Sequence, residues 1–138
     1  DDAHEMRPEV LRLLRLLTNF DMDSRLVVSV VLSGQMPLKR MLLSDELDDI
    51  RQRLVHCGEL GLLTREEAHA YVEHRAQIAG ASQVPFEPQA MDALYEITRG
   101  NMRALDKLAF ASLRVADGGA RSRVDAADVA LARSAQWM

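Results

Sequence analysis

The sequence is poor in cysteine and in aromatic residues, and it has no long apolar run. Its single cysteine, Cys57, excludes an internal disulfide and any zinc site built from several cysteines, and it fits a reducing compartment. The longest apolar run, Leu26 to Leu32, is interrupted by Ser29 and is far too short for a helix that spans a bilayer. No charged segment, apolar stretch and cleavage site open the chain. We therefore expect a cytoplasmic protein without a membrane span in this chain.

Two further absences concern phosphate binding and positive charge. The phosphate loop Gly-x-x-x-x-Gly-Lys-[Ser/Thr] does not occur anywhere in the 138 residues. Lys39 and Lys107 are the only lysines and the formal net charge is -4, so the surface as a whole does not attract nucleic acid. What remains, 48% hydrophobic and 28% charged residues, is typical of a soluble globular chain. The length suffices for one domain or for two small subdomains.

The first part of the chain, residues 1–62, has the pattern of an α/β fold. Pro8 suits the first turn of a helix. The apolar residues of this helix are so crowded that we expect it to pack between a sheet and another layer. Leu26 to Leu32 is rich in β-branched residues and almost continuously apolar, which is typical of a strand covered on both faces in a parallel sheet. Thr18 to Ser24 separates the two elements, and Ser33-Gly34-Gln35 ends the strand.

More helix and a second strand are expected before residue 62. Pro37 allows a helix from about Leu38, a charged helical stretch runs from Asp45 to Arg53, and Leu54 to Cys57 is a candidate final strand. Two strands do not make a stable open sheet, so we expect further strands upstream of Asp1. The start without methionine agrees with a fragment. The predicted fold class of this part is therefore α/β, a partial parallel sheet with helices.

The second part, residues 63–138, has helical patterns only, so the chain is expected to be mostly helical overall. Thr64 and Glu67 have the spacing of a capping box, in which each side chain accepts a hydrogen bond from the backbone amide of the other. Gly80 is expected to end that helix. The later helices are predicted to begin after Pro88, at Asn101 and after the N-cap Asp125.

Three short motifs combine carboxylates and arginines in an order that indicates part of a nucleotide-hydrolysis site. Asp1-Asp2-Ala3-His4 contains two adjacent carboxylates, and Arg53 lies at the end of the charged helical stretch. Gly100-Asn101-Met102-Arg103 places an arginine at a helix N-terminus, where a cation opposes the helix dipole and an anionic ligand would justify it. Each motif alone also has a structural explanation, either a solvated terminus or a solvated helix end. Their shared order along the chain favours the functional explanation.

These motifs and elements resemble the C-terminal half of an AAA+ ATPase module. The nearest type is bacterial general secretion pathway protein A, which is related to ATPases that assist DNA transposition. The resemblance covers nearly the whole chain; it starts at the Walker B motif and lacks the P-loop. It implies a truncated AAA+ core, a P-loop NTPase fold, in residues 1–62 and an all-α helical lid in residues 63–138.

The resemblance implies magnesium and water chemistry for the first motif. Asp1 matches the Walker B carboxylate that holds Mg²⁺ through water. Asp2 matches the carboxylate that polarises the attacking water, but the family usually has glutamate there, and the shorter side chain puts water activation in doubt. Ser33 and Gln35 both match the place of sensor 1, a polar group that orients water against the γ-phosphate. The sequence leaves the choice between them open.

Two arginines complete the implied site. Arg53 matches the arginine finger that reaches the nucleotide of a neighbouring subunit and stabilises charge in the transition state, with Arg51 as the second choice. Arg103 matches sensor 2, which contacts the phosphates from the lid. The resemblance thus implies ATP and Mg²⁺ as cofactors of the intact parent and a homo-oligomer of neighbouring AAA+ subunits.

Two functions follow from this reasoning. The first is a fragment of an ATP-hydrolysing AAA+ protein that couples ATP to the assembly or remodelling of a secretion or DNA-transposition complex, with a secretion protein or DNA as partner. Without Walker A, the chain alone is expected neither to bind ATP tightly nor to hydrolyse it. The alternative is a non-enzymatic helical module that binds DNA or another protein.

Overall fold

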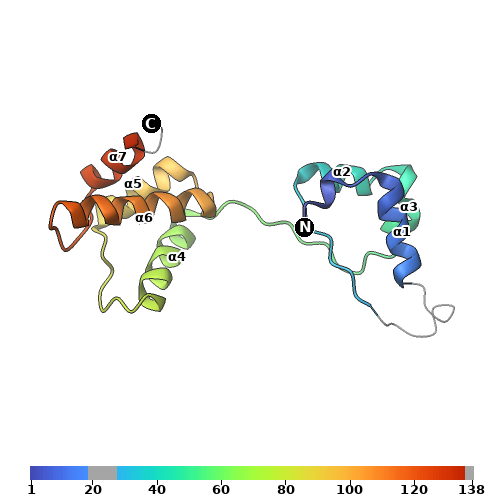
Figure 1. Ribbon diagram of the computed structural model, residues 1–138, viewed down its shortest axis with the longest axis horizontal. Helices are drawn as coiled ribbons and strands as arrows, with labels where there is room; N and C mark the ends of the chain where they lie inside the picture. Colours follow the sequence, from blue (N-terminus) through green and yellow to red (C-terminus); the bar gives the residue numbers. More distant parts are fainter. Residues whose placement is uncertain (19–27, 136–138) are drawn as a thin grey trace. The chain divides into compact units, whose positions relative to one another are not determined.

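The computed structural model describes residues 1–18 and 28–135. The chain divides into two compact units, Asp1–Glu59 and Leu60–Met138 (Figure 1). In the described ranges each unit is built from helices joined by turns and extended segments. None of these helices is both long enough and apolar enough to cross a membrane.

The helices of the first unit are short and enclose a small core. They are α1 (Pro8–Thr18), α2 (Met36–Leu42) and α3 (Asp48–Arg51), with 3-10 turns at Ala3–Glu5 and Asp45–Leu47. Proline lies in the first turn of both α1 and α2, where its missing amide would have no partner inside the helix. Leu11, Leu47 and Ile50 are buried together in the core.

The predicted parallel sheet is wrong, because the residues that the structure describes form no strand in the first unit. Leu26 and Val27 lie outside the described residues, but 28–32 is an extended segment without a paired strand. Its valines are exposed, with Val31 86% accessible. The second expected strand, 54–57, is also unpaired, and Val55 is 84% accessible. A strand is stabilised by the backbone of its neighbour, and the described part of the unit offers no such neighbour.

The environment of α1 differs from the prediction for the same reason. We expected this helix to lie between a sheet and another layer. Leu11 is fully buried, but Leu13 and Leu16 are 57% and 59% accessible. One face of α1, with Leu11 and Leu14, therefore packs on the small core of the unit, while Leu13 and Leu16 are exposed.

The second unit has longer helices and a larger core. They are α4 (Arg65–Ile78), α5 (Pro88–Thr98), α6 (Met102–Gly118) and α7 (Ala126–Ala135). The core gathers apolar side chains from all four helices and from the segments that join them; its most buried members include Leu94, Leu105, Leu108, Val124 and Val129. Phe86 and Val124 also form an isolated parallel bridge, which ties the segment before α5 to the segment before α7.

Local side-chain caps explain where two of these helices begin. The amide of Thr64 donates to Glu67 Oε2 at 2.8 Å, and the amide of Glu67 donates to Thr64 Oγ1 at 3.2 Å, which confirms the predicted capping box. Before α7, the amide of Asp128 donates to Asp125 Oδ1 at 2.9 Å, which confirms Asp125 as a cap. The carboxylate of Asp128 in turn accepts a hydrogen bond from the amide of Asp125 at 3.1 Å, and it also pairs with Arg121.

Removing the cap of α4 should lower the stability of the second unit modestly. We expect Thr64→Ala to reduce its free energy of unfolding by about 1 kcal/mol, because the amide of Glu67 loses its acceptor. Urea unfolding followed by near-ultraviolet circular dichroism measures this, since the only tyrosines, Tyr71 and Tyr95, lie in this unit. Thr64→Ser keeps the acceptor and is the control. Equal losses from both variants would show that the methyl group, rather than the cap, stabilises the helix.

Candidate functional site

The structure brings together two segments of the first unit that are 32 residues apart. The hydroxyl of Ser33 donates a hydrogen bond to Asp1 Oδ1 at 2.9 Å. Beside it, the amide of Ala3 donates to the carbonyl oxygen of Ser33 at 2.9 Å. A carboxylate and a hydroxyl are thus joined at the ends of the two segments, where both remain exposed to solvent.

His4 links the same two segments through a second hydrogen bond, with Gln35. Its Nδ1 accepts a hydrogen bond from the amide of Gln35 at 3.4 Å, so in this arrangement the proton of a neutral ring lies on Nε2. Gly34 allows the close approach, because a Cβ there would lie 3.1 Å from the backbone nitrogen of His4 and 3.0 Å from Leu38 Cδ2. The motif in the sequence contained His4, but its role in positioning the segments was not foreseen. The only signal was its place two residues after Asp2.

Asp2 and Gln35 are less engaged than Asp1 and Ser33. Asp2 adopts a left-handed backbone conformation, with φ of 50°. Its Oδ1 lies 4.0 Å from His4 Nδ1, and its side chain is 67% accessible. Gln35 takes part through its backbone amide, which donates to His4 Nδ1. Of the two candidates for sensor 1, Ser33 is the one whose side chain contacts the carboxylate of Asp1.

The two arginines at and after the end of α3 differ in their surroundings. Arg51 pairs with Asp48, and its Nη1 donates to the carbonyl oxygen of Leu43 at 3.3 Å, so its guanidinium is used within the first unit. Arg53 lies two residues beyond the end of α3 with an exposed side chain. Both positions stay candidates for the arginine finger, and Arg53 remains the first choice from the sequence.

The segment beyond Arg53 is tied back to the first unit by an ion pair. Lys39 Nζ, on α2, lies 2.7 Å from Glu59 Oε2. This hydrogen bond raises the pKa of Lys39 and lowers the pKa of Glu59, and the attraction between the two charges acts in the same direction. Both groups are exposed, so salt screens the pair and its contribution to stability is small.

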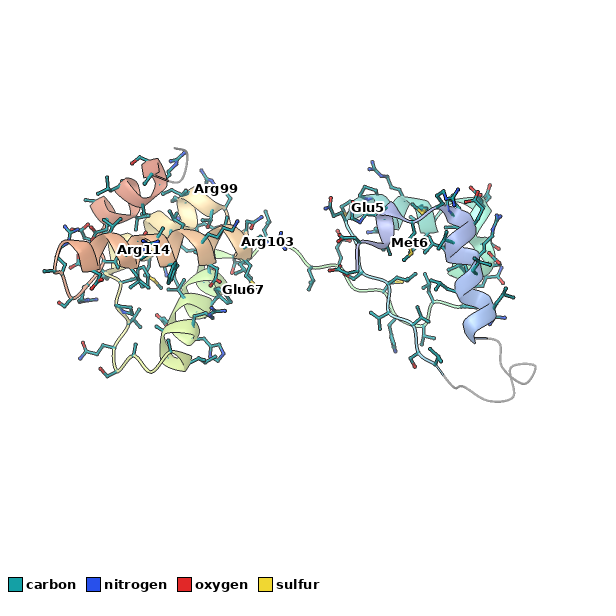
Figure 2. All side chains as sticks on the ribbon, in the orientation of Figure 1. Glu5, Met6, Glu67, Arg99, Arg103 and Arg114 are labelled. Atoms are coloured by element: carbon teal, nitrogen blue, oxygen red, sulfur yellow. The ribbon has the colours of Figure 1, made fainter. Side chains whose placement is uncertain are left out.

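Arg103 lies in the first turn of α6, in the second unit (Figure 2). Asn101 caps this helix, because its side-chain oxygen accepts from the amide of Ala104 at 3.0 Å. Gly100 has φ of 76°, and its carbonyl oxygen accepts from the amide of Leu63 at 2.9 Å. Among the residues that the structure describes, Arg103 has no acidic partner. It is an exposed cation at the positive end of a helix, an arrangement that an anion would stabilise.

The cluster around Asp1 has suitable chemistry for a magnesium ion that keeps most of its water. The Asp1 carboxylate is a hard oxygen ligand of the kind that Mg²⁺ prefers, and Mg²⁺ is usually bound by only one or two carboxylates together with substrate phosphates. The described residues contain no group of three or more histidine, cysteine, aspartate or glutamate side chains that could hold a metal by themselves. Asp1 is therefore suited to a metal site whose other ligands are water and substrate phosphate.

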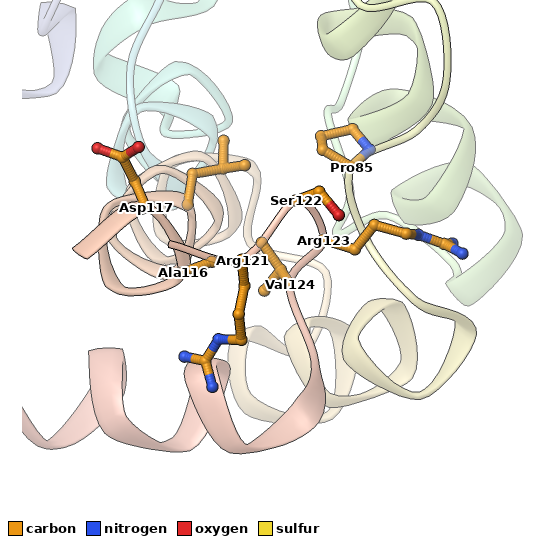
Figure 3. A pocket seen from close by; sticks show the side chains of 8 residues that line it. Pro85, Ala116, Asp117, Arg121, Ser122, Arg123 and Val124 are labelled. Carbon is orange, nitrogen blue, oxygen red and sulfur yellow. The ribbon is translucent and has the colours of Figure 1, made fainter. Parts of the chain in front are cut away.

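A shallow hollow in the second unit offers less chemistry (Figure 3). It has a volume of about 270 Å³ and lies between the C-terminal half of α6 and the segments around Pro85 and Ser122. Its two arginines are already engaged. Arg121 pairs with Asp128, and Arg123 donates to the carbonyl oxygen of Phe86 at 3.0 Å. The hollow thus presents mainly apolar surface.

The chain is similar to one curated protein over almost its whole length. It is 33% identical over 132 residues to general secretion pathway protein A of Aeromonas hydrophila. The match covers 96% of this chain and 24% of that protein, so the chain spans about a quarter of its relative. No family model and no solved structure matches the chain. The identity supports a relation to the family of general secretion pathway protein A, while the assignment of Asp1 to a Walker B motif stays a prediction.

Proposed function

We propose that this chain is part of an AAA+ ATPase of the general secretion pathway protein A type, and that Asp1 and Ser33 belong to its hydrolysis site. The observation that carries the proposal is the 2.9 Å hydrogen bond between Ser33 and Asp1, reinforced by the backbone hydrogen bond from Ala3 to Ser33. A Walker B carboxylate and a sensor 1 residue must act on the same γ-phosphate and water. Two segments that meet at these side chains satisfy that requirement.

The residues of the cluster have distinct roles in this proposal. Bound Mg²⁺ would neutralise charge on the phosphate oxygens during phosphoryl transfer. Asp1 holds the ion through water, and Ser33 orients the Asp1 carboxylate through its donated hydrogen bond. Asp2 polarises the attacking water; its exposed side chain leaves room for that water, although it is shorter by one methylene than glutamate.

The two arginines act on the phosphates from separate elements. Arg103 contacts the phosphates of a nucleotide bound in its own subunit, where the N-terminus of α6 adds favourable partial charge. Arg53 reaches the nucleotide of a neighbouring subunit, which requires a homo-oligomer. ATP and Mg²⁺ are therefore the cofactors of the intact protein, and a separate phosphate loop must complete the site, since this chain contains none.

The name of the related protein favours secretion over DNA transposition as the process that hydrolysis drives. We propose that the protein couples ATP to the assembly or remodelling of a secretion complex.

Replacing Ser33 tests which residue is sensor 1. In the full-length protein, we expect Ser33→Ala to lower ATP turnover about 100-fold with little change in ATP binding, because the Asp1 carboxylate loses the hydrogen bond that orients it. Gln35→Ala is the matched control, since the backbone amide that contacts His4 is retained. Turnover is measured by phosphate release, and binding by titration with a fluorescent ATP analogue.

Two results would contradict the proposal. A Ser33→Ala protein with unchanged turnover would remove Ser33 from the site. An equal loss of turnover for Asp1→Asn and for an exposed control such as Glu9→Gln on α1 would show that the cluster around Asp1 is not catalytic.

A further inference from the structure

The outward face of α6 carries a row of cationic and aromatic side chains. Arg103, Lys107, Phe110 and Arg114 are spaced by four, three and four residues, which places them on one side of the helix. This side is opposite the buried residues of α6, which are Leu105, Leu108, Ser112 and Ala116. We call these four outward residues the α6 stripe. It extends over three turns of helix, or about 16 Å.

The charges of Arg103 and Arg114 in the α6 stripe are not neutralised by acidic side chains in the part of the chain that the structure describes. Within residues 1–18 and 28–135, Arg103 and Arg114 have no acidic partner, and Figure 2 shows both on α6. Asp106 is the acidic residue between them at the edge of the face, and it is engaged elsewhere. The hydroxyl of Tyr71 lies 3.2 Å and Arg75 lies 3.7 Å from its carboxylate, so α4 already uses this charge.

An exposed aromatic ring lies between the cations. Phe110 is 65% accessible, and two other apolar side chains flank the stripe, Met102 at 49% and Leu113 at 36%. Arginine and aromatic residues are the types that contribute most to protein interfaces, where an apolar anchor is surrounded by charged groups. A ring with cations before and after it on one helix face therefore matches a partner that has carboxylates on both sides of an apolar side chain.

We propose that the α6 stripe is a docking surface for an acidic amphipathic helix of a partner protein. Carboxylates of that helix pair with Arg103 and Arg114, and an apolar side chain between them covers Phe110. A helical partner is favoured because the stripe is straight and follows helical spacing, the pattern of helix-on-helix recognition. Nucleic acid is less suitable, since the chain carries a formal net charge of -4 and a polyanion would also meet its acidic surface. This surface shares Arg103 with the proposed contact to nucleotide phosphates, whereas Phe110 and Arg114 have no role in the proposed ATPase activity.

Titration with a designed peptide tests the surface. The probe is a helical peptide with glutamate at positions i, i+4 and i+11 and leucine at i+7. Added to the ¹⁵N-labelled chain, it should shift the amide resonances of residues 102–115 selectively. We expect Phe110→Ser or Arg114→Glu to weaken binding about tenfold, the effect of losing an interface anchor or of placing like charges together. Arg133→Glu on α7 makes the same charge change away from the stripe and should bind as the unaltered chain does.

The controls separate a docking surface from general attraction. A peptide with lysine in place of glutamate should not bind. Arg103 is left unchanged in all variants, so a result here is independent of its proposed contact with phosphate. Since Phe110 and Arg114 are exposed, the variants should keep the melting temperature of the unaltered chain. Shifts spread over both units, or equal binding of Arg114→Glu and Arg133→Glu, would overturn the proposal. So would tighter binding of a 20-nucleotide single strand than of the acidic peptide, because the stripe would then be a nucleic-acid surface.

Discussion

Replacing Gly100 by alanine is expected to destabilise the second unit by about 2–5 kcal/mol, the sum of backbone strain and overpacking. Gly100 has φ of 76°, a conformation that side chains other than glycine rarely adopt. A Cβ at this position would lie 2.0 Å from the carbonyl oxygen and 2.8 Å from the amide nitrogen of Leu63. Backbone atoms cannot rotate away as a side chain can. The hydrogen bond between Leu63 and Gly100 must therefore break or the start of α4 must move.

Gly80 supplies a matched control for this prediction. It also has a positive φ, 86°, but a Cβ there would meet no atom within 4 Å. Gly80→Ala should consequently cost only the backbone term, about 1–2 kcal/mol. The difference between the two variants in urea unfolding measures the contact with Leu63. If both variants lost the same stability, close packing of Leu63 against Gly100 would not contribute.

The second large effect is expected from Arg53→Ala in the full-length protein. If Arg53 is an arginine finger, its loss should lower turnover about 10³- to 10⁵-fold, because charge in the transition state is no longer stabilised. Nucleotide binding should be retained, since the arginine acts on the neighbouring subunit. Phosphate release and equilibrium binding of a fluorescent ATP analogue separate these two quantities.

Arg40→Ala is the control, because Arg40 is an exposed arginine of the same unit, on α2. Mixing experiments give the sharper result. Arg53→Ala subunits should recover activity when they are mixed with subunits that carry Asp1→Asn, since each variant then supplies what its neighbour lacks. Loss of ATP binding in Arg53→Ala would instead show that the arginine acts structurally or within its own subunit.

Some of this structure could be predicted from local sequence. The Thr64–Glu67 capping box and the Asp125 cap were confirmed because each is made by residues three apart, whose interaction depends on little else. The predicted sheet was wrong, because an apolar β-branched segment such as 28–32 becomes a strand only when another strand pairs with it. Apolar composition does not supply that partner.

The candidate site shows the same contrast between local sequence and distant contacts. The sequence by itself determined which residues are candidates for the chemistry, namely two adjacent carboxylates, a serine after an apolar run, and arginines after α3 and at the start of α6. Only the tertiary structure decided that Ser33, and not Gln35, contacts Asp1, that Arg51 is used by Asp48 and Leu43, and that Gly100 must be glycine because Leu63 lies against it. These contacts join residues far apart in the chain or depend on a particular backbone approach. Their distances are set by packing of the whole unit, which spacing along the sequence does not specify.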